Sequence, residues 1–181
     1  MPATPKLSDD RVLRSAHGIV EKHGVDSLSM QSVAAALDVT APALYKRYGD
    51  RDAIVRAVQR RAFATLADAL AGKRSIPELA AAYRTFARKH PFVYEAMFRD
   101  AGALEPADLE ARRAAMAPLF SAIAGLVPPN DALKAARLLT AFVHGFVEME
   151  RLRAFQLGDD VDGAFAYAID ALVQSIQGAR T

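Results

Sequence analysis

Apolar positions recur with helical spacing along most of the chain, between residues that start or stop helices. After Ser8, an N-cap residue, Val12, Ala16 and Val20 repeat every four positions until Gly24 ends the run. The same pattern predicts an all-α protein of about nine helices. The predicted helices cover residues 8–24, 29–37, 40–49, 50–72, 75–90, 91–98, 107–126, 131–155 and 161–176. Residues 1–7 are expected to form a flexible tail.

Two short predicted helices lie close together near the N-terminus. Ser29 is positioned to cap the first helix, and Leu37-Asp38-Val39 forms a tight turn between the two. Thr40 is positioned to cap the second helix, which has Pro42 in its first turn. This arrangement, supported by longer neighbouring helices, predicts a helix-turn-helix in a three-helix N-terminal domain. The second helix of such a motif fits the major groove of DNA.

Composition supports a helical protein of the cytoplasm. Hydrophobic residues make up 52% of the 181 residues, and helix-favouring alanine dominates them. The chain has no cysteine, so disulfides and thiolate zinc sites are excluded. The N-terminus lacks the apolar segment of a secretory signal, and residues 138–149 are too short and too polar to span a membrane. We therefore expect a cytoplasmic protein without a membrane partner.

Charge is unevenly distributed although the net charge is only +2. Residues 1–72 hold ten basic and eight acidic residues, whereas residues 73–181 hold thirteen of each. Several of the basic residues fall in one short stretch: Lys46, Arg47, Arg51, Arg56, Arg60 and Arg61. This stretch is either a nucleic-acid-binding surface or an ordinary solvent-exposed helix face, and charge alone does not distinguish these alternatives.

The segment GVDSLSMQSVAAALDVTAPALYKRYGDRDAI resembles the N-terminal domain of TetR/AcrR-type regulators. The likeness covers about residues 8–72. It rests on the spacing of the following positions: Ala34, Leu37, Val39, Thr40, Leu44, Tyr45, Arg47 and Tyr48. One departure is Asp38, where such turns usually carry glycine. This position is expected to need a positive φ, which Asp tolerates better than most residues.

The resemblance implies a set of DNA-contacting residues. Gln31, Thr40, Ala41 and Lys46 are candidates for base or phosphate contact, while Tyr45, Arg47 and Arg51 are candidates for phosphate clamps. Ala43 joins them because small residues at the start of the second helix allow close approach to base edges. For Tyr45 the alternative is an ordinary half-buried aromatic, and for Ala41 and Ala43 it is an ordinary helix alanine.

The second part of the chain, residues 73–181, resembles the C-terminal ligand-binding domain named for a Trp-His-Gly motif. His144-Gly145 and the following Glu150 match that type, although the chain has no tryptophan. The last two predicted helices are apolar on nearly every side, and a helix of this kind has to be buried on every side. One face can serve the chain's own core and the other a second copy, so we expect a homodimer through these two helices.

A small, largely hydrophobic effector is the expected ligand of this C-terminal domain. The candidate lining is Tyr83, Phe86, Phe92, Tyr94, Phe98, Phe120 and Phe142, with His144 and Glu148 as polar groups. The alternative for the aromatic residues is plain core. His144 and Glu148 lie four positions apart and could share a ligand or a metal, but a simple hydrogen-bonded pair is favoured because no third metal ligand is evident. No cofactor is expected.

The function implied is that of a DNA-binding transcriptional regulator, a ligand-responsive repressor that binds a pseudo-palindromic operator as a homodimer. The sequence leaves activation open. An enzyme is disfavoured because the chain lacks the HExxH, GxSxG and Gly-rich phosphate-loop motifs. A helical interaction module that has lost DNA binding is the second alternative. Such a module would lack the salt-dependent DNA affinity that phosphate contacts impose.

Overall fold

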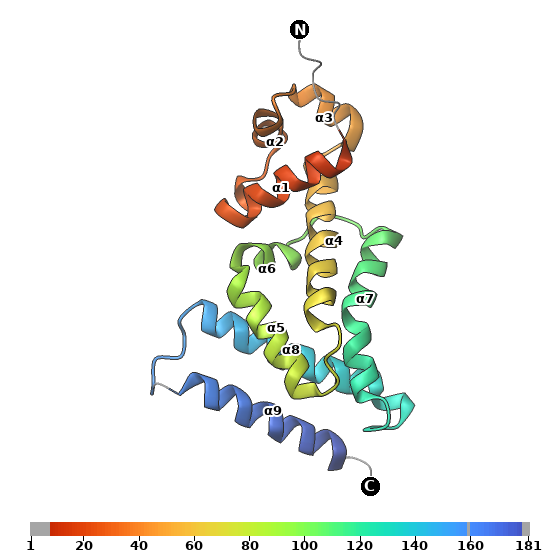
Figure 1. The fold of residues 1–181 in the computed structure, drawn as a ribbon, viewed down its shortest axis with the longest axis vertical. Coiled ribbons are helices and arrows are strands. Elements are labelled where there is room, and N and C mark those ends of the chain that lie inside the picture. The colour runs from red at the N-terminus through yellow and green to blue at the C-terminus, as the bar shows by residue number, and fades with distance from the viewer. Residues whose placement is uncertain (1–7, 159, 179–181) are drawn as a thin grey trace. The chain divides into compact units, whose positions relative to one another are not determined.

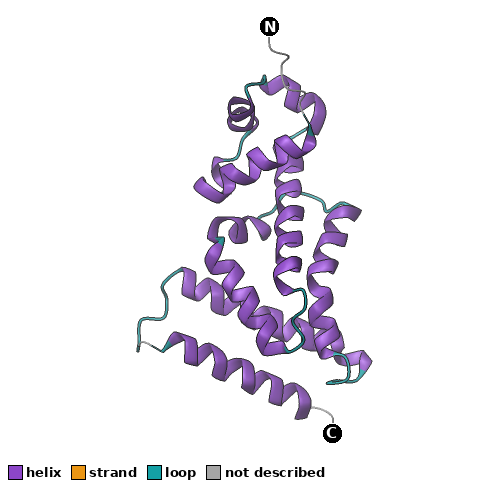
Figure 2. Cartoon of the chain, viewed as in Figure 1, coloured by secondary structure: helices purple, strands orange, loops and turns teal. Residues whose placement is uncertain are grey.

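The computed structural model describes residues 8–158 and 160–178, and these residues form nine α-helices, two short 3-10 helices and no β-strand (Figures 1 and 2). The helices are α1 (Asp9–His23), η1 (Val25–Ser27), α2 (Met30–Leu37), α3 (Ala41–Tyr48), α4 (Arg51–Leu70), α5 (Ile76–Lys89), α6 (Pro91–Met97), α7 (Pro106–Ile123), η2 (Pro129–Asp131), α8 (Ala132–Arg151) and α9 (Val161–Gly178). The prediction of an all-α fold with about nine helices is confirmed. The predicted tail, residues 1–7, lies outside the described residues.

The described chain folds into two compact units. The first unit contains the residues up to Phe63 together with His90–Arg112, and the second contains Ala64–Lys89 and the residues from Arg113 onward. The continuous helices α4 and α7 each begin in the first unit and end in the second. The division of the sequence into residues 1–72 and 73–181 stays a prediction. No helix of the described residues is long and apolar enough to cross a membrane.

The first unit is built around the apolar face of α1. Val12, Ala16 and Val20 are each at most 1% exposed, because their spacing of four residues places them on one side of the helix. Leu28 and Met30, which follow η1, are equally buried. The Oγ of Ser8 accepts a hydrogen bond from the Arg11 N–H, as predicted for an N-cap. Gly24 ends α1 at a φ of 79°, which confirms the predicted C-terminal stop.

A second cap lies at the start of α5 in the second unit. The Oγ of Ser75 accepts from the Glu78 N–H, and the Glu78 carboxylate accepts from the Ser75 N–H at 3.0 Å. These reciprocal bonds form a capping box that fixes the start of the helix. Farther along, α5 packs against α8 and α9.

Some predicted helix boundaries are wrong. The helix expected over residues 131–155 ends at Arg151, because Arg153 takes a φ of 54° and turns the backbone away from the helical path. Asn130, a cap-type residue directly before the predicted start of this helix, does not cap it. It lies inside η2, and Asp131 occupies the N-cap position of α8. The Pro-Pro pair that marks the break also favours a short 3-10 turn before the helix begins.

Candidate functional site

The helix-turn-helix is formed by α2 and α3 of the first unit. Ser29 and Ser32 form two reciprocal hydrogen bonds at the start of α2. The Ser32 N–H donates to the Ser29 Oγ at 2.9 Å, and the Ser29 N–H donates to the Ser32 Oγ. Asp38 ends α2 at φ 54° and ψ 49°, so the predicted left-handed turn is present. The Val39 N–H then reaches the carbonyl of Ala34 at 3.0 Å. These local bonds fix the chain reversal that separates the two helices.

Helix α3 has one buried face and one exposed face. Leu44 is fully buried, which anchors α3 to the core of the first unit. Ala43, Lys46 and Arg47 are exposed, and the side chain of Tyr45 is 47% exposed. Tyr48 is half-buried, one turn after Leu44. An aromatic ring this exposed beside two cations is unusual for a core residue, and this face suits contact with a polyanion.

The remaining predicted contact residues surround this exposed face unequally. Gln31 is exposed in the first turn of α2, and Thr40 is exposed immediately before α3. Thr40 occupies the N-cap position as predicted, but its hydroxyl caps none of the described backbone N–H groups. Ala41 is half-buried, so less of its methyl group is available than of Ala43. The motif therefore presents Gln31, Thr40 and Ala43 to solvent together with the exposed residues of α3.

The carboxylate of Asp9 joins α1 to the last turn of α3. Its Oδ1 accepts from the Tyr48 hydroxyl at 2.5 Å and from the Arg47 Nε at 2.8 Å. The hydrogen bond from Arg47, with that from Tyr48, lowers the pKa of Asp9 to about 2 and raises the pKa of Arg47. Burial and the bond to Asp9 raise the pKa of Tyr48 to about 12. The three groups therefore carry fixed charge states at neutral pH.

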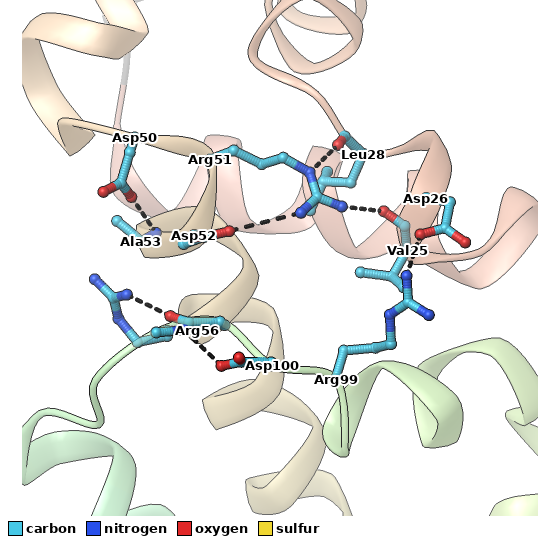
Figure 3. A network of polar contacts seen from close by, with 12 residues as sticks. Val25, Asp26, Leu28, Asp50, Arg51, Asp52, Ala53, Arg56, Arg99 and Asp100 are labelled. Carbon is cyan, nitrogen blue, oxygen red and sulfur yellow. Dashed lines mark hydrogen bonds and ion pairs between the residues drawn. The ribbon is translucent and has the colours of Figure 1, made fainter.

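Arg51 begins α4 and connects that helix to the segment between α1 and α2 (Figure 3). Its Nε donates to the Leu28 carbonyl at 2.6 Å, and its Nη2 donates to the Val25 carbonyl at 2.8 Å. Asp50 caps the same helix by accepting from the Ala53 N–H at 2.7 Å. A planar guanidinium can reach two carbonyls at once, whereas an ammonium group cannot do so in the same geometry.

The second unit contains an apolar cavity of about 60 Å³ among helices α4, α5, α7 and α8. Its lining consists of Leu66, Leu70, Ile76, Leu79, Ala80, Tyr83, Ala115, Met116, Leu119, Leu139, Thr140 and Val143. Tyr83 and Thr140 are the polar side chains of that lining. Such a wall suits an apolar ligand oriented by one or two hydrogen bonds.

The structure does not bring the predicted effector residues together. Among the described residues that line the cavity, only Tyr83 belongs to the predicted set. Phe92, Tyr94 and Phe98 come from α6 and its end in the first unit, where Tyr94 is fully buried. In the second unit, Phe86 is buried, and Phe120 is 38% exposed. The sequence pattern identified aromatic residues but not the side of each helix on which they lie.

The three predicted residues of α8 make other contacts or lie apart from the cavity. The Phe142 ring stacks on Phe165 of α9, with centroids 6.3 Å apart. The Glu148 carboxylate accepts from Arg151 at 2.9 Å. His144 is half-buried on the same helix. No group of three or more His, Asp or Glu side chains in the described part of the chain could hold a metal ion.

Comparison with protein-family models identifies both parts of the chain. Residues 12–58 match the model described as bacterial regulatory proteins of the tetR family, which includes the whole helix-turn-helix. Residues 76–172 match the tetracyclin repressor-like C-terminal domain. The chain belongs to the TetR family. It is therefore a DNA-binding transcriptional regulator, as the sequence predicted. The finer likeness to the Trp-His-Gly type stays a prediction.

Similar proteins align with almost the whole length of this chain. An uncharacterised helix-turn-helix-type transcriptional regulator of Mycobacterium tuberculosis is 29% identical over 87% of this chain and 75% of its own. A solved structure of a protein from Rhodococcus sp. RHA1 is 26% identical, with a TM-score of 0.77 and coverage of 97% and 98% of the two chains. BioQ of Mycobacterium smegmatis is 25% identical, with a TM-score of 0.67 and coverage of 96% and 99%.

A TetR variant of Acinetobacter baumannii shares the fold, with a TM-score of 0.71 at 22% identity over 97% of this chain and 99% of its own. That structure is a complex with minocycline. Proteins of the TetR family bind DNA operators as dimers and respond to small effector ligands. The family is one of transcriptional regulators rather than of enzymes.

Two contacts of the helix-turn-helix and its neighbouring helices were not predicted from the sequence. Asp9 was not among the predicted contact residues, yet its carboxylate binds Arg47 and Tyr48. Arg51 was predicted to clamp phosphate, and its bonds to two backbone carbonyls were missed. Both contacts join residues more than twenty positions apart, so helix periodicity and capping rules carry no information about them.

Proposed function

We propose that this protein is an effector-responsive repressor that binds a pseudo-palindromic operator as a homodimer. The observation that carries the proposal is the exposed face of α3, where Tyr45, Lys46 and Arg47 lie beside the buried anchor Leu44. A helix presented in this way can enter the major groove with its N-terminal residues nearest the bases. Two such heads in a two-fold dimer would contact two half-sites in successive major grooves.

The proposed contacts divide into two classes. Thr40, Ala41 and Ala43 lie at the start of α3, where small side chains and methyl groups meet base edges, with Gln31 of α2 beside a base or phosphate. Tyr45, Lys46 and Arg47 lie farther along α3 and contact phosphates. The predicted phosphate contact of Arg51 has to coexist with its two bonds to backbone carbonyls. Phosphate contacts determine register and affinity, and the base contacts determine the operator sequence.

The proposed dimer uses α8 and α9. Helix α8 buries Leu139, Val143 and Val147 within its own unit but leaves Leu138 and Met149 about 45% exposed. On α9, Tyr167 is 78% exposed. Exposed apolar side chains on two neighbouring helices, beside a face already buried in the chain's own core, support a contact with a second copy. A self-complementary contact of this kind closes after two chains.

The proposed effector is small and largely hydrophobic, and it binds the apolar cavity among α4, α5, α7 and α8. The lining is apolar except for the hydroxyls of Tyr83 and Thr140. About 60 Å³ is far less than the several hundred Å³ of a typical ligand pocket, so a larger effector has to move the surrounding helices apart. Leu66 and Leu70 of the lining belong to α4, the helix that begins at Arg51 next to the DNA-binding motif. A ligand with different affinity for two positions of α4 would change operator affinity.

Operator selection from a random DNA pool tests the DNA-binding part of the proposal. We expect enrichment of a pseudo-palindromic sequence, with an affinity that falls steeply as the salt concentration rises. Tyr45→Ala and Lys46→Met should each weaken binding, while Lys73→Met, at an exposed lysine before α5, should not. The proposal that α3 contacts DNA would be contradicted if no sequence were enriched and both α3 variants bound random DNA with wild-type affinity.

Graded straight-chain alcohols, from short to long, test the effector part. We expect the longer alcohols to release the selected operator, because their alkyl chains replace empty apolar volume. Ala115→Leu should fill the cavity and remove this response while keeping the operator affinity of the wild type. The matched control is Ala114→Leu, one residue earlier on the exposed side of α7. Equal responses of both variants would place the effector elsewhere.

A further inference from the structure

Asp9 occupies a contact that the DNA-binding role of the protein does not require. It is the first residue of α1, and its side chain is 73% exposed. Its Oδ1 nevertheless lies 2.8 Å from the Nε of Arg47 and 2.5 Å from the hydroxyl of Tyr48. These two donors come from the last turn of α3, the helix proposed to contact DNA. An acidic group is therefore held against a cation on the proposed phosphate-binding face.

A carboxylate and a phosphate bind a guanidinium through the same N–H donors and the same geometry. A carboxylate already bound to Arg47 must therefore be displaced or share its partner when a phosphate approaches. Its own negative charge also repels a phosphate within a few ångströms, because the effective dielectric near a protein surface is lower than that of water. The second bond, from Tyr48, holds the carboxylate at this position instead of leaving it to move through solvent.

We infer that Asp9 competes, within the same chain, with the DNA phosphate for Arg47, and that it lowers the affinity of the helix-turn-helix for DNA. The inference rests on the proposed function, in which Arg47 contacts a phosphate. Such a competitor weakens binding to every sequence alike, because a phosphate contact carries no sequence information. It therefore lowers retention on non-specific DNA without changing which operator is preferred.

The neighbouring residue provides a matched control. Asp10 lies in the same first turn of α1 and carries the same charge, but its carboxylate pairs with Arg14 of α1. Both aspartates interact with the positive end of the α1 dipole, so replacing either one costs similar helix stability. An effect of the net charge of the DNA-binding region alone would change the DNA affinity of both variants equally. Competition for Arg47 would appear only when Asp9 is replaced.

The experiment compares Asp9→Asn and Asp10→Asn in binding to the selected operator and to a random duplex at several salt concentrations. Asparagine keeps an oxygen that can accept from Tyr48 but has no negative charge. For Asp9→Asn we expect binding to both DNAs to be about 3- to 10-fold tighter at low salt. The slope of log affinity against log salt concentration should be steeper by about the release of one more counterion. Asp10→Asn should change the affinity by less than about 2-fold. Equal affinities of the two variants, or weaker binding by Asp9→Asn, would overturn the inference.

Arg47→Gln separates failure of this inference from failure of the proposed DNA contact. If Arg47→Gln keeps the affinity and salt dependence of the wild type, Arg47 does not contact phosphate, and both proposals about this residue fail. If Arg47→Gln weakens binding while Asp9→Asn matches Asp10→Asn, only the competition by Asp9 fails. We expect Arg47→Gln to weaken binding and to abolish the gain from Asp9→Asn in the double variant, as coupled residues do.

Discussion

The guanidinium of Arg84 in α5 meets the carboxylate of Glu150 in α8 through two hydrogen bonds, from Nε at 2.9 Å and from Nη2 at 2.7 Å. The same guanidinium lies over the rings of Phe146 and Phe165, 5.5 and 4.8 Å from their centroids. The Arg84 side chain is only 9% exposed, and the bonds to Glu150 raise its pKa. One arginine thus connects three helices of the second unit.

Replacing Arg84 with methionine should therefore destabilise the second unit. Methionine keeps much of the apolar contact with Phe146 but leaves the Glu150 carboxylate without its bidentate partner. We expect a loss of about 1–3 kcal/mol in the free energy of unfolding, less than for a fully buried pair because Glu150 is 22% exposed. Urea unfolding measures it, with the exposed Arg137→Met as control. A loss no larger than that of the control would mean that Arg84 adds nothing beyond surface charge.

Arg51 and Lys46 should separate folding from DNA binding. Arg51→Met removes two bonds to backbone carbonyls and should lower the free energy of unfolding by about 1–2 kcal/mol. Lys46→Met removes an exposed cation, so it should leave the free energy of unfolding unchanged. It should also reduce the slope of log DNA affinity against log salt concentration by about the release of one counterion. Thermal unfolding and DNA titrations on both variants test this. Unchanged stability with a reduced salt dependence in Arg51→Met would make Arg51 a phosphate clamp instead.

Tyr48 should release its proton at about pH 12, well above an ordinary tyrosine. The folded state holds this proton more tightly than the unfolded state. The resulting stabilisation is complete below about pH 10 and is lost as the pH rises through 12. Asp9→Asn should lower the pKa of Tyr48 only part of the way, because burial is the larger cause. Tyrosinate absorbance, assigned with Tyr48→Phe, measures the shift. An unchanged pKa in Asp9→Asn would contradict the contact.

The sequence was sufficient for local structure and insufficient for contacts between distant segments. Ser8 and Ser29 were identified as caps because capping depends on residues three or four positions apart. The effector residues were chosen for their aromatic character, whereas the cavity is lined mainly by aliphatic residues such as Leu79. Which helix face borders a cavity depends on how the helices pack, and one sequence does not specify that packing.

The half-buried His17 should make the protein less stable in acid. Burial lowers its pKa, with Glu21 opposing the shift and Arg61 and His90 reinforcing it. The folded state therefore binds fewer protons than the unfolded state below the ordinary pKa of 6.5. Its stabilising contribution is present above that value and declines as the pH falls. His17→Gln should reduce the drop in melting temperature between about pH 8 and about pH 5. His23→Gln, at an exposed histidine of the same helix, should retain the drop.

The turn of the helix-turn-helix should tolerate glycine better than any branched residue. Asp38 has a φ of 54°, a conformation in which a Cβ atom is crowded by the following carbonyl. Asp38→Gly removes that crowding but adds freedom to the unfolded chain, so we expect a net gain of at most about 1 kcal/mol. Asp38→Val should lose about 1–2 kcal/mol. Thermal unfolding distinguishes these outcomes. Because Asp38 lies outside the proposed contact residues, Asp38→Gly should keep the operator affinity, and a large loss of affinity would show that its carboxylate or this exact turn also serves recognition.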